Sequence, residues 1–183
     1  MAMKVESMTG TCEPATPSQA PGTSSRPTHH LLTLESFFSE YTLFTYIPTN
    51  HPSDEFARLV SENQWSKKGE KYKQAKEEYD LALVIEFGKI YGSDERSWDS
   101  WRTLCEVLGV EEVPGSVTAC KKIVRNTHVN LADLVATFAT GQPVEIFPDR
   151  RALKVYTRRT KKIFPKATAK SSSLLKCLLR RMF

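Results

Sequence analysis

The sequence predicts an all-α fold, a compact single-domain array of about six to eight helices with at most one short extended segment. Apolar residues recur at spacings of three and four along most of residues 31–183, as on the buried faces of amphipathic helices. Ser, Asn or Asp stands just before several of these segments, and Gly follows some of them, as expected of helix caps. No internal repeat of roughly 20 to 50 residues is visible, which argues against a solenoid.

The 183-residue chain is expected to divide into a disordered leader, residues 1–30, and one helical domain, residues 31–183. The leader contains a stretch rich in Pro, Ser and Thr, residues 14–27, which has almost nothing apolar to bury. Two adjacent histidines, His29 and His30, follow it and are expected to be solvated. The remaining chain is long enough to bury a core without disulfides or metals.

The first elements of the domain combine an aromatic segment with two helices. A short helix over residues 34–40 is followed by an extended stretch that reaches Pro48 and covers the core. Ser53 is a suitable N-cap for a helix over residues 54–63. The longest helix is expected over residues 70–91, where apolar residues recur at spacings of three and four. Because the stretch 81–85 is apolar all round, this helix should be the central one.

Three shorter helices are expected next, over residues 98–108, 116–125 and 131–140. Ser97, Ser116 and Asn130 supply their N-terminal caps. Their inward faces are expected to be Trp98, Trp101, Leu104, Cys105 and Leu108 in the first, Val117, Cys120, Ile123 and Val124 in the second, and Leu131, Leu134, Val135 and Phe138 in the third.

The end of the chain should contain an extended piece and two helices. Apolar and polar residues alternate in the short stretch 143–147, which is expected to form the extended piece. Asp149 then caps a helix over residues 150–160. Ser171 or Ser172 then begins a last helix. Its apolar stripe consists of Leu174, Leu175, Leu178, Leu179 and Met182.

Charge is strongly segregated along the sequence. Residues 150–183 carry twelve Lys or Arg and no acidic residue, whereas the first 149 residues hold 14 basic and 21 acidic ones. A fold does not require such segregation, so it points to a partner. The predicted contact site for an acidic protein surface or nucleic acid is Arg150, Arg151, Lys154, Arg158, Arg159, Lys161, Lys162, Lys166 and Lys170.

Other interpretations of the basic end remain open at this stage. The cations can instead pair with the acidic body, with Leu153, Tyr156 and the leucine stripe packed on it. The last helix can lie on an anionic membrane, which is not expected because the helix is short and has no Trp on its apolar stripe. The stretch 158–162 also has the composition of a nuclear import signal, which is compatible with any of these.

Catalysis is not expected. Cys105 and Cys120 fall on the apolar faces of their helices, where cysteine acts as a small hydrophobic residue. Glu86 interrupts an apolar run, so it should either face solvent or pair with Arg102 or Arg125.

Asp133, near the start of its helix, is expected only to compensate the helix dipole. Glycine-rich phosphate-binding loops are absent from the sequence. The alternative function is an enzyme or small-ligand-binding regulator with a site between helix 70–91 and helix 97–108, which a cluster of Glu86 with His128 or Cys105 would support.

The four cysteines, Cys12, Cys105, Cys120 and Cys177, show neither a C-x-x-C motif nor a histidine at metal-ligand spacing. We therefore expect reduced thiols, no metal site and no cofactor. Residues 1–30 lack the apolar region of a signal peptide, and no apolar run approaches the roughly 18 residues of a membrane span. A cytoplasmic or nuclear location is expected.

A series of short stretches runs from an aromatic start to a basic end: FFSEY at 37–41, EFARL at 55–59, WRTLC at 101–105, CKK at 120–122, VNLADLV at 129–135, Tyr156-Thr157, FPK at 164–166 and residues 174–181. In these stretches the chain resembles small fungal helical proteins of unknown function. The resemblance implies a fungal source and one co-linear domain to which the basic end belongs. It implies no activity, cofactor or catalytic residue.

Overall fold

The computed structural model describes residues 33–182, and the predicted leader lies outside this range. The described chain forms eight α-helices, one 3₁₀ helix and a two-stranded sheet, which confirms the all-α prediction. In chain order the elements are α1 (Leu34–Ser39), α2 (Pro52–Glu62), α3 (Glu70–Tyr91), α4 (Trp98–Val107), α5 (Val117–Asn126), β1 (His128–Val129), α6 (Leu131–Thr140), β2 (Ile146–Phe147), α7 (Arg150–Thr160), η1 (Thr168–Ser171) and α8 (Ser173–Met182).

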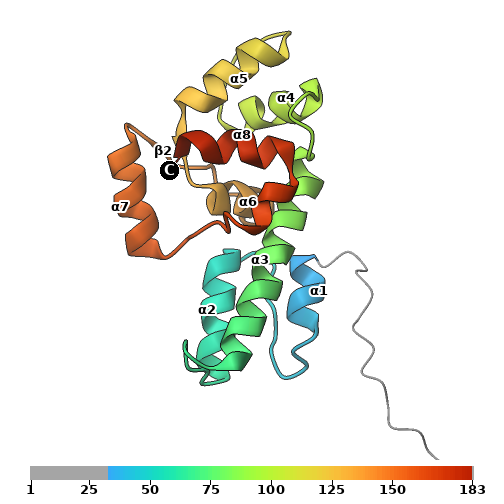
Figure 1. Ribbon diagram of the computed structural model, residues 1–183, viewed down its shortest axis with the longest axis vertical. Helices are drawn as coiled ribbons and strands as arrows, with labels where there is room; N and C mark the ends of the chain where they lie inside the picture. Colours follow the sequence, from blue (N-terminus) through green and yellow to red (C-terminus); the bar gives the residue numbers. More distant parts are fainter. Residues whose placement is uncertain (1–32, 183) are drawn as a thin grey trace, which may run out of the picture.

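Helix α3 is the axis of the molecule, as the sequence predicts (Figure 1). Its first half packs against α1 and α2, while its second half meets α4, α6 and η1. The change in partners follows the sequence, since the first half is amphipathic and the residues from Ala82 to Val84 are all buried. Buried side chains of α1 to α6, η1 and α8 form one continuous core around this helix.

Aromatic side chains form the core between α1, α2 and the first half of α3. The ring of Phe56 stacks on that of Tyr79 with centroids 4.5 Å apart, and Phe38 stacks on Tyr46 at 4.4 Å. Tyr46 belongs to the segment before Pro48, so this segment covers the core as predicted. Such ring pairs contribute beyond the area they bury.

Helix α8 is attached to the loop between α3 and α4 (Figure 1). The backbone N–H of Leu174 donates to the Ser93 carbonyl at 3.1 Å, and the Ser173 hydroxyl accepts from the Glu95 N–H at 2.9 Å. The side chains of Leu174, Leu175 and Leu178 are buried in the core. These three leucines of the stripe therefore pack inside the protein and are not available to a membrane surface.

Three details of the expected fold are wrong. The cap of α2 is His51, whose Nδ1 accepts from the Ser53 N–H at 3.1 Å, so the helix begins at Pro52 and not after Ser53. Phe138 is 61% exposed, because the apolar stripe of α6 continues past the end of the core. Trp98 lies at the protein surface, and its indole N–H donates to the Pro114 carbonyl at 3.3 Å. Glu86 is partly exposed, which is one of the two outcomes expected for it, and it pairs with neither Arg102 nor Arg125.

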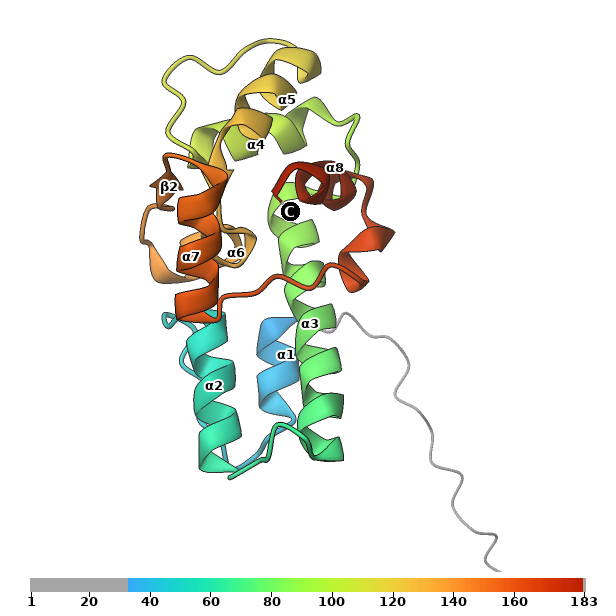
Figure 2. The ribbon, with the colours of Figure 1, turned by 60° about the vertical axis from the view of Figure 1, so that its left-hand side comes forward.

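The extended piece before α7 has a partner that the sequence did not indicate. Strand β2 pairs antiparallel with β1, so that Phe147 lies opposite His128 and Ile146 opposite Val129. The two strands flank α6 in the sequence, and their pairing helps to place α7 beside α6 (Figure 2). This short sheet positions the basic end of the chain.

Two glycines of the α3 region are expected to respond oppositely to substitution by alanine. Gly92 ends α3 at a φ of +81°, and a Cβ there would lie 2.5 Å from Ser100 Oγ, so Gly92→Ala should destabilise by about 1–3 kcal/mol. Gly88 lies inside the helix with open space around its Cβ position, so Gly88→Ala should stabilise by about 0.5–1 kcal/mol. Urea unfolding of both variants checks the pair. Equal changes would contradict the conformational role of Gly92.

Candidate functional site

Helix α7 carries most of the predicted site and is the most peripheral helix of the fold (Figure 2). Asp149 caps it as predicted, accepting from the Ala152 N–H at 2.8 Å, and Leu153 is its only fully buried residue. The helix ends at Lys161, whose φ of 59° is left-handed. This turn sends residues 162–166 back beside the helix before the chain crosses α3.

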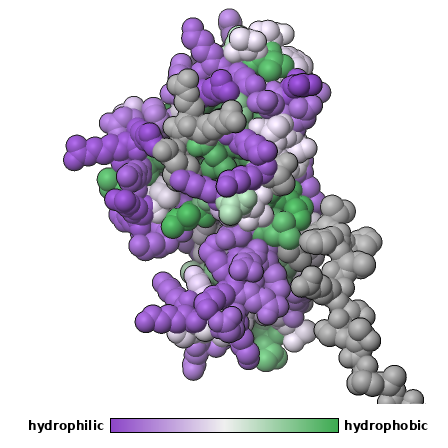
Figure 3. Space-filling model, viewed as in Figure 1, coloured by the Kyte–Doolittle hydropathy of each residue, from purple (hydrophilic) through white to green (hydrophobic). Residues whose placement is uncertain are grey.

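The predicted site residues are exposed, with one exception. Lys162 is half-buried and paired, while the other eight side chains face solvent. Seven of these, Arg150, Arg151, Lys154, Arg158, Arg159, Lys161 and Lys170, form no ion pair with any acidic side chain of residues 33–182. Within residues 33–182, these seven cations are thus not paired with carboxylates of the acidic body. In Figure 3 hydrophilic side chains project from the side that carries α7, with apolar patches among them.

Helix α7 presents two different basic faces. On the first, Arg150, Lys154 and Arg158 line one wall of a cavity of about 370 Å³. Lys162 and Lys166 lie on its other wall. The remaining lining residues form its floor and mouth, and they are Asn130, Leu131, Leu153, Thr157, Ile163 and Phe164. We call this site the cationic cavity; its lining includes five cations and no acid.

The second face of α7 differs in charge and shape. Arg151, Val155 and Arg159 line a more open hollow that also contains Glu145 and Asp149. The acidic side chains reduce the local positive potential there. Of the two faces, the cationic cavity is the less open one, and its charged lining residues are all cations.

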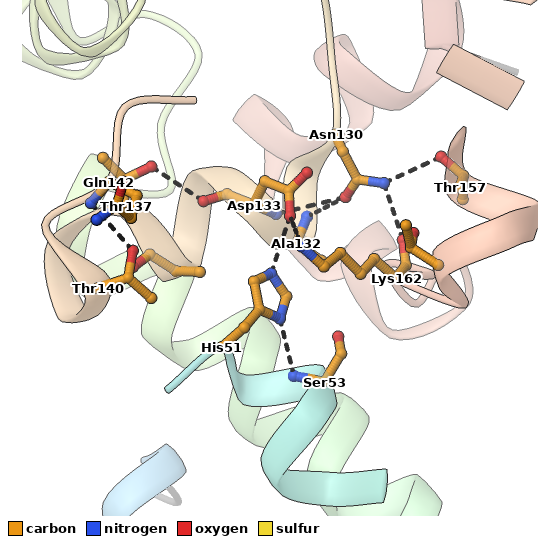
Figure 4. Close-up of polar contacts among 12 residues, drawn as sticks. His51, Ser53, Asn130, Ala132, Asp133, Thr137, Thr140, Gln142, Thr157 and Lys162 are labelled. Carbon is orange, nitrogen blue, oxygen red and sulfur yellow. Dashed lines mark hydrogen bonds and ion pairs between the residues drawn. The ribbon is translucent and has the colours of Figure 1, made fainter. Parts of the chain in front are cut away.

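Asn130 fixes the walls of the cavity relative to one another (Figure 4). Its Oδ1 accepts from the Ala132 N–H at 2.8 Å, which caps α6 as predicted. Its Nδ2 donates to Thr157 Oγ1 at 3.0 Å and to the Lys162 carbonyl at 2.9 Å. One buried amide thus connects α6, α7 and residues 162–166, which we call the returning segment. The sequence carries no signal for this role.

Asp133 makes a second connection behind the cavity (Figure 4). Its Oδ1 accepts from Lys162 Nζ and from His51 Nε2, both at 2.9 Å. His51 Nε2 carries the hydrogen because Nδ1 is the acceptor of the α2 cap. The expectation that Asp133 only compensates a helix dipole is therefore wrong.

The electrostatics of Asp133 favour its ionised form. Burial raises the pKa of the carboxyl, but hydrogen bonds from His51 and Lys162 outweigh it and leave the pKa lowered. Oδ2 is buried and has no hydrogen-bond partner among the described residues, although the Tyr156 hydroxyl lies near the carboxylate. Lys162 also donates to that hydroxyl at 3.0 Å. Lys162 is thus held by the fold, unlike the seven cations that form no ion pair within residues 33–182.

The residues of the alternative site are not brought together. Glu86 lines a separate hollow beside Leu34 and Phe138, and its nearest cation is Lys89 at 3.9 Å. Burial and the neighbouring Cys120 raise the pKa of Cys105 to about 12, which disfavours the thiolate that catalysis needs. His128 lies in β1, and no hydrogen bond within residues 33–182 joins it to Glu86 or Cys105.

Two general features of the described chain bear on ligands and membranes. Between residues 33 and 182, no three or more His, Cys, Asp or Glu side chains gather so as to hold a metal ion. None of the helices in this range combines the length and apolar character needed to cross a bilayer.

Comparisons with known protein families, curated proteins and solved structures find no match to this chain. The resemblance to small fungal helical proteins therefore stays a prediction.

Proposed function

We propose that this protein is a non-enzymatic intracellular binding domain that contacts an acidic protein or nucleic acid through its basic C-terminal helices. The observation that carries the proposal is the set of seven exposed cations that form no ion pair within residues 33–182. Like charges held close together repel one another, and an acidic partner relieves that repulsion.

The contacts of α7 support a role in binding. The helix is long enough to display three turns of cations, yet it contributes one fully buried side chain to the protein interior. Its basic residues can therefore be contacted without disturbing the core. The three described cysteines, Cys105, Cys120 and Cys177, are free thiols, which supports placing the protein in the cytoplasm or nucleus.

The proposal is tested by replacing Arg158, Arg159 and Lys161 with Ala. Fluorescence anisotropy would follow binding of the full chain to generic duplex DNA, single-stranded RNA and polyglutamate over about 50 to 200 mM salt. We expect weaker binding to at least one of these polyanions. For duplex DNA, the salt slope should decrease by about one for each replaced cation that touches a phosphate in the parent complex.

The matched control replaces Lys67, Lys68 and Lys71, which are three exposed cations near the start of α3. The same charge is removed, so general electrostatic attraction changes equally in both variants. Equal losses of affinity in the two variants, or no binding of the parent protein at low salt, would contradict the proposal. Lys162 is left unchanged because its pairing with Asp133 belongs to the fold.

A further inference from the structure

The floor of the cationic cavity is apolar. Leu131, Leu153 and Phe164 are buried there, and Ile163, 54% exposed, lies at the mouth among the cations. The volume of about 370 Å³ lies in the range of ligand-binding pockets. A cavity of this kind accepts an aliphatic side chain.

The polar groups of the floor are already used. The Asn130 amide donates two hydrogen bonds and accepts from the start of α6, and the Thr157 hydroxyl accepts one of those bonds. A ligand group placed on the floor therefore finds few hydrogen-bond partners. Burying a polar group without such partners is costly, whereas burying a methyl group is favourable.

The wall formed by α7 has a regular charge spacing. Arg150, Lys154 and Arg158 are four residues apart, so successive cations are separated by about 6 Å along the helix axis. Alternate residues of an extended peptide are separated by about 6.6 Å and point to the same side. Acidic residues two apart in an extended segment therefore match successive turns of α7.

The same features disfavour a single-stranded nucleic acid in this cavity. Base recognition without sequence preference needs exposed aromatic rings for stacking. Phe164 is buried with its ring edge-to-face against Phe87 at 6.0 Å, and Tyr156 packs on Phe147 at 4.8 Å while bonded by Lys162. Phosphates would also leave the exposed Ile163 unused.

We propose that the cationic cavity is the docking site for an extended acidic peptide segment with one apolar anchor residue. The anchor enters the floor beside Leu131 and Leu153, and its acidic neighbours pair with Arg150, Lys154 and Arg158. The proposal rests on the proposed function and names its partner as an acidic protein.

Two synthetic peptides test the anchor. The first has a central Leu flanked on each side by three acidic residues, and the second has Ser in place of that Leu. By anisotropy with the full chain, the Leu peptide should bind about tenfold more tightly, since burying one leucine side chain supplies at least that factor. An oligothymidine of similar charge should bind more weakly than the Leu peptide.

Two double charge reversals test the location. Lys154→Glu with Arg158→Glu changes the cavity wall, whereas Arg151→Glu with Arg159→Glu changes the net charge equally on the second face of α7. The cavity variant should lose at least about thirtyfold in affinity for the Leu peptide, and the second-face variant only a few-fold. All four side chains are exposed, so both variants should fold.

A second pair of variants tests the apolar contact without changing charge. Ile163→Ser should abolish most of the preference for Leu over Ser, whereas Val155→Ser on the second face should preserve it. The two residues are similarly exposed, at 54% and 59%. If the charge-reversed cavity variant does not fold, this pair still tests whether the anchor residue binds in the cationic cavity.

The outcomes separate the two proposals. Equal binding of the Leu and Ser peptides, tighter binding of oligothymidine, or equal losses of affinity from changes on both faces would overturn the peptide site and leave the proposed function standing. Absence of binding to every polyanion at low salt would overturn both. The expected pattern supports both: the cavity charge reversal lowers affinity far more than the second-face reversal, and Ile163→Ser, but not Val155→Ser, removes most of the preference for Leu.

Discussion

Replacing Glu55 with Ala is expected to lower the free energy of unfolding by about 3–5 kcal/mol. Glu55 is 1% exposed, and its carboxylate holds the segment before α2 against that helix. Its Oε2 accepts from the Ile47 N–H at 3.0 Å and from Arg58 Nη2 at 2.6 Å, and its Oε1 accepts from Asn50 Nδ2 at 2.8 Å. Removing the carboxylate leaves these donors without their acceptor.

The chain supplies a matched control for this variant. Glu62 also pairs with Arg58, at 2.8 Å, but is 47% exposed, so Glu62→Ala should cost less than about 1 kcal/mol. Urea unfolding of the two variants measures the difference. Similar costs would show that the burial of Glu55 is not what makes it important.

The acid sensitivity of the protein should follow the same carboxylate. Burial raises the pKa of Glu55, but hydrogen bonds from Arg58, Asn50 and Ile47 outweigh it and lower the pKa below its ordinary value. A carboxyl with a lowered folded pKa stabilises above its unfolded pKa, about 4.3, and loses that contribution as the pH falls through the folded pKa. The Glu55→Gln variant should therefore lose less stability than the parent protein over this acidic range.

Replacing Asp133 with Ala is expected to lower the free energy of unfolding by about 2–4 kcal/mol. The substitution leaves the half-buried amino group of Lys162 without its carboxylate and deprives His51 Nε2 of its acceptor. The effect should appear as a lower midpoint in urea, without a large change in the slope. It should be smaller when Lys162 is already Met, and the coupling of the two substitutions is expected to be about 1–3 kcal/mol.

Asp99 provides the control for Asp133. It also lies in the first turn of a helix, α4, but it is exposed and compensates only the dipole, so Asp99→Ala should cost about 0.3–1 kcal/mol. If the Asp133→Ala and Asp99→Ala variants lose the same small amount of unfolding free energy, Asp133 acts through the dipole alone. The contacts with His51 and Lys162 would then contribute nothing to stability.

Most of the fold was predictable because helix caps and apolar periodicity are local. Ser97, Ser116, Asn130 and Asp149 all cap the helices that the sequence assigned to them. The cap of α2 was missed because His51 and Ser53 both carry an acceptor, and the pattern does not distinguish them. Phe138 was misplaced because periodicity identifies the apolar side of a helix but not where the core ends.

The candidate site was predictable in composition but not in shape. The exposed cations are those that charge counting identified. The cavity depends on the left-handed turn at Lys161, which brings residues 162–166 beside α7, and no glycine marks this turn in the sequence. The pairing of Asp133 with His51 joins residues 82 positions apart, and such contacts leave no local pattern.

The attachment of α7 has a thermodynamic consequence. The helix contributes one fully buried side chain, and the polar contacts of Asn130 and Lys162 hold it to the body. A ligand in the cationic cavity touches α7, α6 and the returning segment together. A bound ligand would therefore add contacts between α7 and the rest of the protein. Each tenfold excess of ligand over its dissociation constant would stabilise the native state by about 1.4 kcal/mol. In the proposed complex, ligand binding and the folding of α7 would therefore be linked.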